Sequence, residues 1–310
     1  MKKHKICKIL LVILAIFLCV AFYELLGICV AYKKQPEVSN TTKKETKNGS
    51  WNECSENTER AVIIEKNPEA LLQRVRLIKN AKKEIILSTF AFQSDESGKL
   101  ILGALHDAAD RGVHIRLLVD GMESWIDMEG NPYFYGLSSH ENVEIKLYNK
   151  ANPLKPWKMM GRMHDKYLIA DGKRYILGGR NTYNYFLGDF PGHKNYDRDV
   201  LVVCDEPEKE NSVNQLLEYF ETIWEQEDSG YFHDNKKLAN RKSVKNAVLE
   251  LQNGYQKYFE ENKERICDTD YTDETFETEK IALVSNPIHT GSKEPVVWYQ
   301  LGELMKNAKN

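Results

Sequence analysis

A histidine and a lysine lie two positions apart at His164 and Lys166, within a run of residues that is typical of a β-strand. Side chains two positions apart on a strand point to the same face of a sheet. That face would present an imidazole, which can act as a nucleophile or an acid, beside a fixed positive charge. A phosphate diester repels nucleophiles through its negative charge, so this pair is suited to attack on such a diester.

The residues around this pair predict a β-hairpin that would position it. Residues 163–170 and 174–177 have the composition of two strands, and Asp171 with Gly172 between them favours a tight primed turn. An aspartate is what such a turn requires, so we predict structural support from Asp171. After the second strand, Gly178 and Gly179 would let the backbone approach an anion closely, which predicts substrate binding there.

The complete pattern His-x-Lys-x4-Asp-x6-Gly-Gly-x-Asn resembles the signature of the phospholipase D superfamily. Its ending, Gly-Gly-Arg-Asn, is most similar to the cardiolipin synthase branch. The first half of the pattern alone would arise by chance in roughly a few per cent of chains of this size. The glycine pair and Asn181, at the right offsets, make the pattern specific.

The resemblance implies a mechanism without metal or cofactor. One histidine attacks phosphorus and forms a phosphohistidine, while the histidine of a second half protonates the leaving alcohol. Lysines and asparagines of both halves hold the non-bridging oxygens. Carried over to this chain, His164 is the histidine of one half, Lys166 is the cation and Asn181 is the neutral donor. One half does not tell which of the two histidines is the nucleophile.

A carboxylate that holds the other imidazole nitrogen would fix the tautomer of a catalytic histidine. Asp197 and Asp199 lie at the start of the apolar segment 198–204, where the family often has an acidic residue. We choose Asp197 as the catalytic partner and keep Asp199 as the alternative. A solvated strand start would explain either aspartate equally well. Asp165 is expected to point away from His164.

The N-terminal segment predicts a membrane anchor. Residues 1–8 form a basic flank, and residues 9–32 are apolar except for Glu24. The apolar stretch exceeds the roughly 20 residues that cross a bilayer core, and it lacks the small-x-small cleavage pattern of a secretory signal. The basic flank favours a single-pass protein of the cell membrane with an extracytoplasmic catalytic domain, although lysines after the span weaken this orientation. Residues 33–60 are predicted to be a polar linker.

An internal repeat relates two distant parts of the chain. Residues 76–83 (RLIKNAKK) are echoed by residues 303–310 (ELMKNAKN), and an apolar, strand-like segment precedes each copy, at 61–64 and 281–284. A single repeat on this scale favours a duplicated domain over a solenoid. We therefore expect the chain to be truncated at the start of a second domain.

Strand-like and helix-like segments alternate between these ends, which predicts an α/β fold. Together with the resemblance, this indicates a phospholipase D-like α/β sandwich, with a central mixed β-sheet flanked by helices and one transmembrane helix before it. We expect a first phospholipase D-like domain at 61–227, a charged helical connector at 228–279 and the truncated second domain at 280–310. The predicted strands are 61–65, 84–92, 113–120, 143–148 and 198–204, and the predicted helices are 68–80, 98–110 and 212–225.

Composition argues against two other classes of partner. The formal net charge of −3 gives no electrostatic case for nucleic acid. The six cysteines lack metal-like spacing, so we predict no metal site.

Three functions remain open. The first is a membrane-anchored phosphatidyltransferase similar to cardiolipin synthase, acting on a phospholipid such as phosphatidylglycerol. The second is a phospholipase D-like phosphodiesterase, either a lipid hydrolase or a nuclease, that uses water as acceptor. The third is a non-catalytic anchored fragment with half a site. An active enzyme would obtain its second half from the same full-length chain or from a homodimer.

Overall fold

The computed structural model describes residues 2–31, 33, 36–49, 59–204, 206, 211–233, 235–278 and 281–308. The chain divides into two compact units. The smaller contains Met1–Asn48, Ala151–Arg162 and Val284–Asn310, and the larger contains Gly49–Lys150 and Met163–Leu283. The larger unit carries the His-x-Lys motif.

A mixed β-sheet is the centre of the larger unit. Its strands are β1 (Glu59–Ile64), β2 (Glu84–Thr89), β3 (His114–Asp120), β4 (Val143–Tyr148), β5 (Tyr167–Ala170), β6 (Arg174–Gly178), β7 (Asp199–Cys204), β8 (Ser229–Tyr231) and β9 (Phe276–Thr278). In the described part of the chain they are ordered β8-β4-β3-β2-β5-β6-β7-β1-β9. Strands β2, β3 and β4 are parallel, and all other neighbours are antiparallel.

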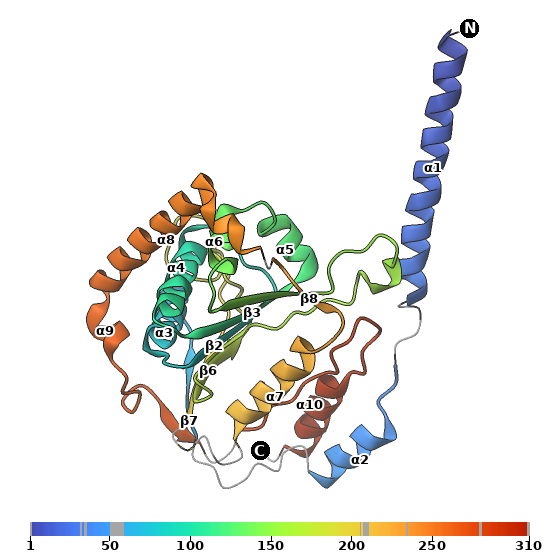
Figure 1. Ribbon diagram of the computed structural model, residues 1–310. Helices are drawn as coiled ribbons and strands as arrows, with labels where there is room; N and C mark the ends of the chain where they lie inside the picture. The colour runs from blue at the N-terminus through green and yellow to red at the C-terminus, as the bar shows by residue number, and fades with distance from the viewer. Residues whose placement is uncertain are drawn as a thin grey trace. The chain divides into compact units, whose positions relative to one another are not determined.

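Helices cover both faces of this sheet, with α3 and α4 on one face and α7 on the other (Figure 1). The helices of the unit are α3 (Asn67–Asn80), α4 (Glu96–Asp110), α5 (Gly121–Asp127), α6 (Pro132–Ser138), α7 (Ser212–Trp224), α8 (Lys242–Glu261) and α9 (Lys263–Cys267). Alternation along the strands decides which face a side chain serves. Leu168 belongs to the main hydrophobic core, whereas its neighbour Tyr167 packs edge-on against Phe220 of α7, with ring centres 6.5 Å apart.

The predicted mixed α/β architecture is confirmed, and the predicted strands and helices of residues 61–225 occur with small shifts in their ends, except that the first strand of the hairpin loses its first four residues. Strand β2 ends at Thr89 instead of 92, because the chain then pairs with Thr182 outside the sheet. The backbone N–H of Thr182 donates to Ala91 O at 3.1 Å, and that of Gln93 donates to Thr182 O at 3.2 Å.

Residues 228–278, expected as a connector, pack within the larger unit. Strand β8 pairs with β4, and β9 pairs with β1. Helix α8 lies so close to α4 that a Cβ on Gly103 would stand 2.7 Å from Leu251 O. The buried Arg76 of α3 donates to the carbonyls of Asp268 and Asp270 at 2.8 and 2.7 Å. These contacts make the segment part of the same fold.

The smaller unit contains the predicted anchor. Helix α1 spans Lys2–Ala31, and its stretch Lys5–Ala31 has a mean hydropathy of 2.9 over its most apolar window, which is long and apolar enough to cross a membrane. Tyr32, the last residue of the predicted span, lies outside the described residues. The predicted linker is not without structure, because it contains α2 (Asn40–Asn48).

The C-terminal copy of the repeat is helical over residues 303–307. Helix α10 (Val296–Asn307) ends at Asn307, just as α3 ends at the equivalent Asn80. The strand predicted before it, at residues 281–284, is not formed. The smaller unit also contains the short 3-10 helix η2 (Pro156–Lys158).

Candidate active site

One edge of the sheet gathers the motif residues. Because neighbouring strands are antiparallel, β2 and β6 end at this edge while β5 and β7 begin there. His164 and Lys166 directly precede β5, Asn181 follows β6, and Asp197 precedes β7. We call this the motif edge. The topology thus brings together residues that are up to 33 positions apart in the sequence.

The hairpin of β5 and β6 has the predicted primed turn. Asp171 and Gly172 have φ values of 55° and 61°, as a type I′ turn requires. The Asp171 carboxylate accepts from the backbone N–H groups of Lys82, Lys83 and Glu84 at 2.9, 2.7 and 3.0 Å. It thereby ties the turn to the start of β2, at the edge of the sheet opposite the motif edge.

The strand predicted over 163–166 is wrong, because β5 begins only at Tyr167. The backbone N–H of Met163 donates to the Asp120 carboxylate at 3.1 Å instead of joining a sheet ladder. Asp120 is almost fully buried and also caps α5. His164, which directly follows Met163, is exposed. Its ring lies edge-on to the ring of Phe90, with ring centres 4.6 Å apart and an angle of 65° between the planes.

Lys166 is buried next to this histidine, with 5% of its surface exposed. Its Nζ donates to the carbonyl oxygen of His164 at 2.5 Å and lies 5.3 Å from the centre of the Phe90 ring. Burial lowers the pKa of Lys166 to about 8, and the charges of Asp165 and Asp197 act in the opposite direction. The site therefore holds a cation that is only partly stabilised by the protein.

Asn181 is also buried, and its Oδ1 accepts from the backbone N–H of Ala91 at 3.2 Å. This bond fixes the orientation of the amide and leaves the Nδ2 donor available within the described part of the site. Phe90, which packs on His164, directly precedes Ala91. The end of β2 therefore holds both His164 and Asn181.

The two glycines of the motif are required by close packing. A Cβ on Gly178 would stand 2.0 Å from an oxygen of Asp199, and one on Gly179 would stand 2.0 Å from an oxygen of Asp197. The anions that approach this backbone are thus the protein's own carboxylates. Substrate binding by the same glycines stays a prediction.

The two candidate aspartates have different partners. The Asp199 side chain is fully buried and pairs with Arg74 at 2.9 Å and with Arg180 at 3.3 Å. Asp197 is half-buried, accepts from the backbone N–H of Arg198 at 2.7 Å, and raises the pKa of Lys166 by its charge. Since Asp199 is already engaged by two arginines, Asp197 remains the better candidate for a role at the motif edge.

Arg180 and Asp165 make contacts with other parts of the fold. Arg180, inside the Gly-Gly-Arg-Asn segment, donates to the carbonyls of Ile64 and Glu65 at 3.1 and 2.7 Å, which fastens β6 to the end of β1. Asp165 accepts from the hydroxyl of Tyr219 on α7 at 2.7 Å.

Sequence reasoning missed Phe90 and Asp120. Phe90 lies within the predicted strand 84–92 and Asp120 ends the predicted strand 113–120, and no local pattern shows what either side chain contacts. The described residues contain no group of three or more His, Cys, Asp or Glu side chains arranged to hold a metal ion.

Solved structures with a similar fold include the phosphatidylserine synthase of Haemophilus influenzae Rd KW20. It shares 17% identity at a TM-score of 0.47, covering 71% of this chain and 48% of that one. NucT from Helicobacter pylori shares 17% identity at a TM-score of 0.44, covering 56% of this chain and 99% of that one. Likeness at this level carries no information about activity.

Curated relatives match at higher identity over part of their length. An uncharacterized protein of Helicobacter pylori strain J99 is 30% identical over 212 residues, which is 64% of this chain and 39% of that protein. Cardiolipin synthase C of Escherichia coli K12 is 29% identical over 171 residues, 51% of this chain and 34% of that enzyme. The matched region therefore spans well under half the length of these relatives.

The family model described as the PLD-like domain of cardiolipin synthase matches residues 74–224. This range includes all of the predicted site residues. Two of the curated relatives that match this chain are named cardiolipin synthase. Residues 74–224 are therefore a cardiolipin synthase-like domain of the phospholipase D superfamily.

Proposed function

We propose that this protein is a membrane-anchored phosphatidyltransferase that acts on phospholipid phosphodiesters through a phosphohistidine, as the resemblance to cardiolipin synthases implies. The observation that carries the proposal is the pairing of an exposed imidazole, His164, with the buried ammonium of Lys166. Helix α1, which is apolar enough to span a membrane, supports a substrate that lies in a bilayer.

Each motif residue has a chemical task in this proposal. A phosphodiester bound at the motif edge would place its non-bridging oxygens against the Lys166 ammonium and the Asn181 amide. These groups offset the negative charge that develops as a nucleophile approaches. Asp197 would keep Lys166 charged and is our candidate for holding the imidazole of His164. Gly178 and Gly179 would let the backbone lie close to the phosphate.

The reaction proceeds in two balanced steps. A histidine nitrogen forms a bond to phosphorus while the bond from phosphorus to the leaving alcohol breaks, and that alcohol takes a proton from an acid. The acceptor hydroxyl then attacks phosphorus, gives its proton to the same group, and frees the histidine. His164 is one of the two histidines needed, as nucleophile or as acid.

A second half-site must supply the other histidine. The sequence contains the His-x-Lys motif once. We propose that the second half comes from a further domain of a longer chain or from a second copy in a homodimer. The helical repeat α10, which ends at the residue equivalent to the end of α3, favours the longer chain.

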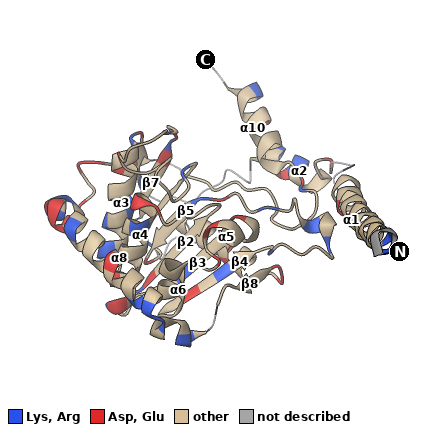
Figure 2. Ribbon diagram, turned by 90° about the horizontal axis from the view of Figure 1, so that it is seen from above, with Lys and Arg blue, Asp and Glu red and all other residues tan. Residues whose placement is uncertain are grey.

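The charge distribution favours a lipid over a nucleic acid as substrate. Figure 2 shows basic and acidic residues side by side along α8, and the net charge of the whole chain is −3. A polyanion is normally bound by an excess of basic residues on one face.

The direct test is turnover of acyl-labelled phosphatidylglycerol by the protein with its native flanking sequence, reconstituted in vesicles. We expect labelled cardiolipin from the wild type and a loss of at least about 10³-fold in His164→Ala, since general acid–base and nucleophilic groups contribute at this level. The matched control is His114→Ala, which should keep full activity. His114 is the first residue of β3 and lies at the edge of the sheet opposite the motif edge.

Two outcomes would contradict the proposal. Full activity in His164→Ala would remove the catalytic assignment. Release of phosphatidic acid without cardiolipin would show that water is the acceptor, and the protein would then be a lipid hydrolase.

A further inference from the structure

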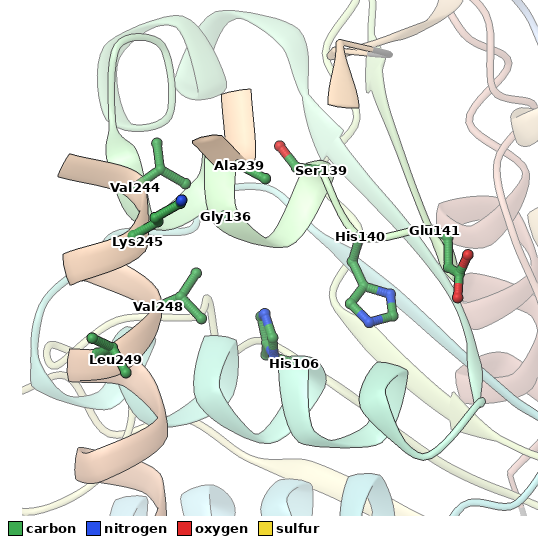
Figure 3. A pocket seen from close by; sticks show the side chains of 10 residues that line it. All are labelled: His106, Gly136, Ser139, His140, Glu141, Ala239, Val244, Lys245, Val248 and Leu249. Atoms are coloured by element: carbon green, nitrogen blue, oxygen red, sulfur yellow. The ribbon is translucent and has the colours of Figure 1, made fainter. Parts of the chain in front are cut away.

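A cavity of about 670 Å³ lies within the larger unit, between α4, α6, α8 and the short 3-10 helix η3 (Lys236–Asn240) (Figure 3). Its size falls in the range of about 300–1,000 Å³ that is typical of small-molecule sites. Val244, Val248 and Leu249 of α8 supply an apolar wall. Gly136 of α6 packs closely against this wall, because a Cβ there would stand 2.6 Å from a methyl group of Val248. None of the motif residues lines it.

The cavity lies toward the edge of the sheet opposite the motif edge. Helix α4 begins after Asp95 and ends at Asp110, and β3 then returns to Asp120 at the motif edge. The cavity is lined by His106, near the end of α4, and by His140, which precedes β4. A ligand here would not compete directly for the phosphodiester site.

Asp110 connects the two histidines of this cavity. Its Oδ2 lies 3.1 Å from His106 Nδ1, and its Oδ1 lies 3.2 Å from His140 Nε2. The backbone N–H of Asn142 donates to His140 Nδ1 at 3.1 Å. His140 must therefore carry its proton on Nε2 and donate it to Asp110, so both of its nitrogens are used inside the protein.

His106 is left with one nitrogen for a ligand. Because the Asp110 carboxylate can only accept, Nδ1 of His106 carries the proton, and Nε2 is an acceptor in the neutral ring. The ring stands up from α4 into the space below α6 and beside α8 (Figure 3). A carboxylate behind the imidazole strengthens Nε2 as an acceptor, as it does for imidazoles that bind metals.

The charges around the cavity favour a neutral ligand. Lys245 and Glu141 both line it and carry opposite charges, and Asp110 places a further negative charge behind His106. This combination gives no advantage to a carboxylate or a phosphate. A neutral hydroxyl can donate to His106 Nε2 without the cost of burying a charge.

We propose that this cavity is a second ligand site that binds a small amphiphilic alcohol, whose hydroxyl donates to His106 Nε2 while its apolar body packs on Val244 and Val248. This site is independent of the proposed phosphatidyltransferase activity. It requires only a single hydroxyl donor and an apolar group of small-molecule size.

The test uses the full chain in detergent and three matched probes. These are 3-phenyl-1-propanol, its methyl ether, which lacks the donor, and 3-phenylpropanoate, which is anionic. Calorimetry measures affinity after subtraction of binding to empty micelles, and the ¹⁵N resonance of His106 Nε2 reports contact with the hydroxyl. We expect the alcohol to bind at least about tenfold more tightly than the other two, as one added hydrogen bond allows.

Variants separate the hydroxyl contact from general partitioning. His106→Leu should abolish the advantage of the alcohol over the ether, and Val248→Trp should fill the cavity and abolish binding of both. His114→Leu, which removes a histidine outside the cavity, should leave every affinity unchanged. Equal affinities for alcohol and ether would overturn the proposal, as would tighter binding of the carboxylate. Binding that is indifferent to His106→Leu and Val248→Trp would place the alcohol elsewhere.

Discussion

Two groups of charged side chains lie near the ends of β6 and β7, yet they differ in exposure and in partners. The first is an arginine–aspartate cluster of Arg74, Arg180 and Asp199, which is buried and closed by two ion pairs. The second is the motif edge, where Lys166 is buried against a carbonyl oxygen and makes no direct ion pair with a described residue. His164 beside it is exposed.

The difference indicates which group is built for structure and which can accept a ligand. In the arginine–aspartate cluster both guanidinium groups share the carboxylate of Asp199 inside the protein, so each of these charges already has an ionic partner. At the motif edge, burial disfavours the charged form of Lys166. A phosphate bound beside it would favour that charged form again. The glycine pair makes both arrangements possible, because Gly178 admits Asp199 and Gly179 admits Asp197.

Lys166→Met is expected to separate activity from stability most strongly. Methionine keeps the volume and removes the charge, so phosphodiester turnover should fall by about 10³-fold through loss of charge stabilisation. Stability should not fall, because a costly buried ammonium is removed. Turnover of labelled phosphatidylglycerol and the thermal unfolding midpoint measure the two effects. A lower midpoint with intact turnover would reverse the roles that we assign to the two groups.

Asp199→Ala should show the opposite pattern. It leaves Arg74 and Arg180 buried without their shared carboxylate, which is expected to cost about 3–5 kcal/mol in free energy of unfolding. Asp197→Ala should cost less than about 1 kcal/mol, as its side chain is only half-buried. Denaturant titration of both variants provides the measurement, and equal losses would contradict the distinction between the two aspartates.

Asp197→Asn should shift the pH dependence of activity. The proposed reaction uses protonated Lys166, whose pKa is about 8, so the rate should fall as pH rises through that value. The Asp197 charge raises this pKa, so its removal lowers the pKa further and moves the alkaline limb to lower pH. The control is Asp189→Asn, which changes an exposed loop residue. If the alkaline limb of the pH–rate profile stays in place or moves to higher pH, Asp197 does not raise the pKa of Lys166.

Phe90→Leu is expected to give the smallest effect. The ring lies 5.3 Å from Lys166 Nζ, and a cation–π contact of this kind contributes about 0.5–1 kcal/mol. Its loss should lower the pKa of Lys166 and shift the alkaline limb down by less than about one pH unit. Phe190→Leu, whose ring lies near the outer Lys194, is the control. A pH profile unchanged by Phe90→Leu would show that the ring only packs on His164.

Local patterns predicted much of the fold. The primed turn at Asp171 and Gly172 follows from residues that tolerate positive φ, and the hydrophobic runs of β3 and β4 mark buried parallel strands. The segment 163–166 was predicted wrongly as a strand, because hydrophobic alternation does not reveal that Asp120 takes up the N–H of Met163. The packing of residues 228–278 depends on partners far away in the chain, which their charged composition conceals.

The sequence by itself identified the candidate site and the chemistry that we propose for it. The types and spacing of His164, Lys166 and Asn181 indicate phosphodiester chemistry within the phospholipase D superfamily, and the apolar N-terminal stretch indicates a helix that could cross a membrane. These features are local, since a short segment contains each of them.

Only the tertiary structure decided which of several similar residues has a structural role and which lies at the candidate site. Asp197 and Asp199 look alike in sequence, but the buried Arg74 and Arg180 take up Asp199. Phe90 joins the site because β2 ends beside β5, and Asp110 joins His106 to His140 because α4 ends beside the loop before β4. Burial and the charges of distant neighbours determine these roles, and both arise only when the strands and helices pack together.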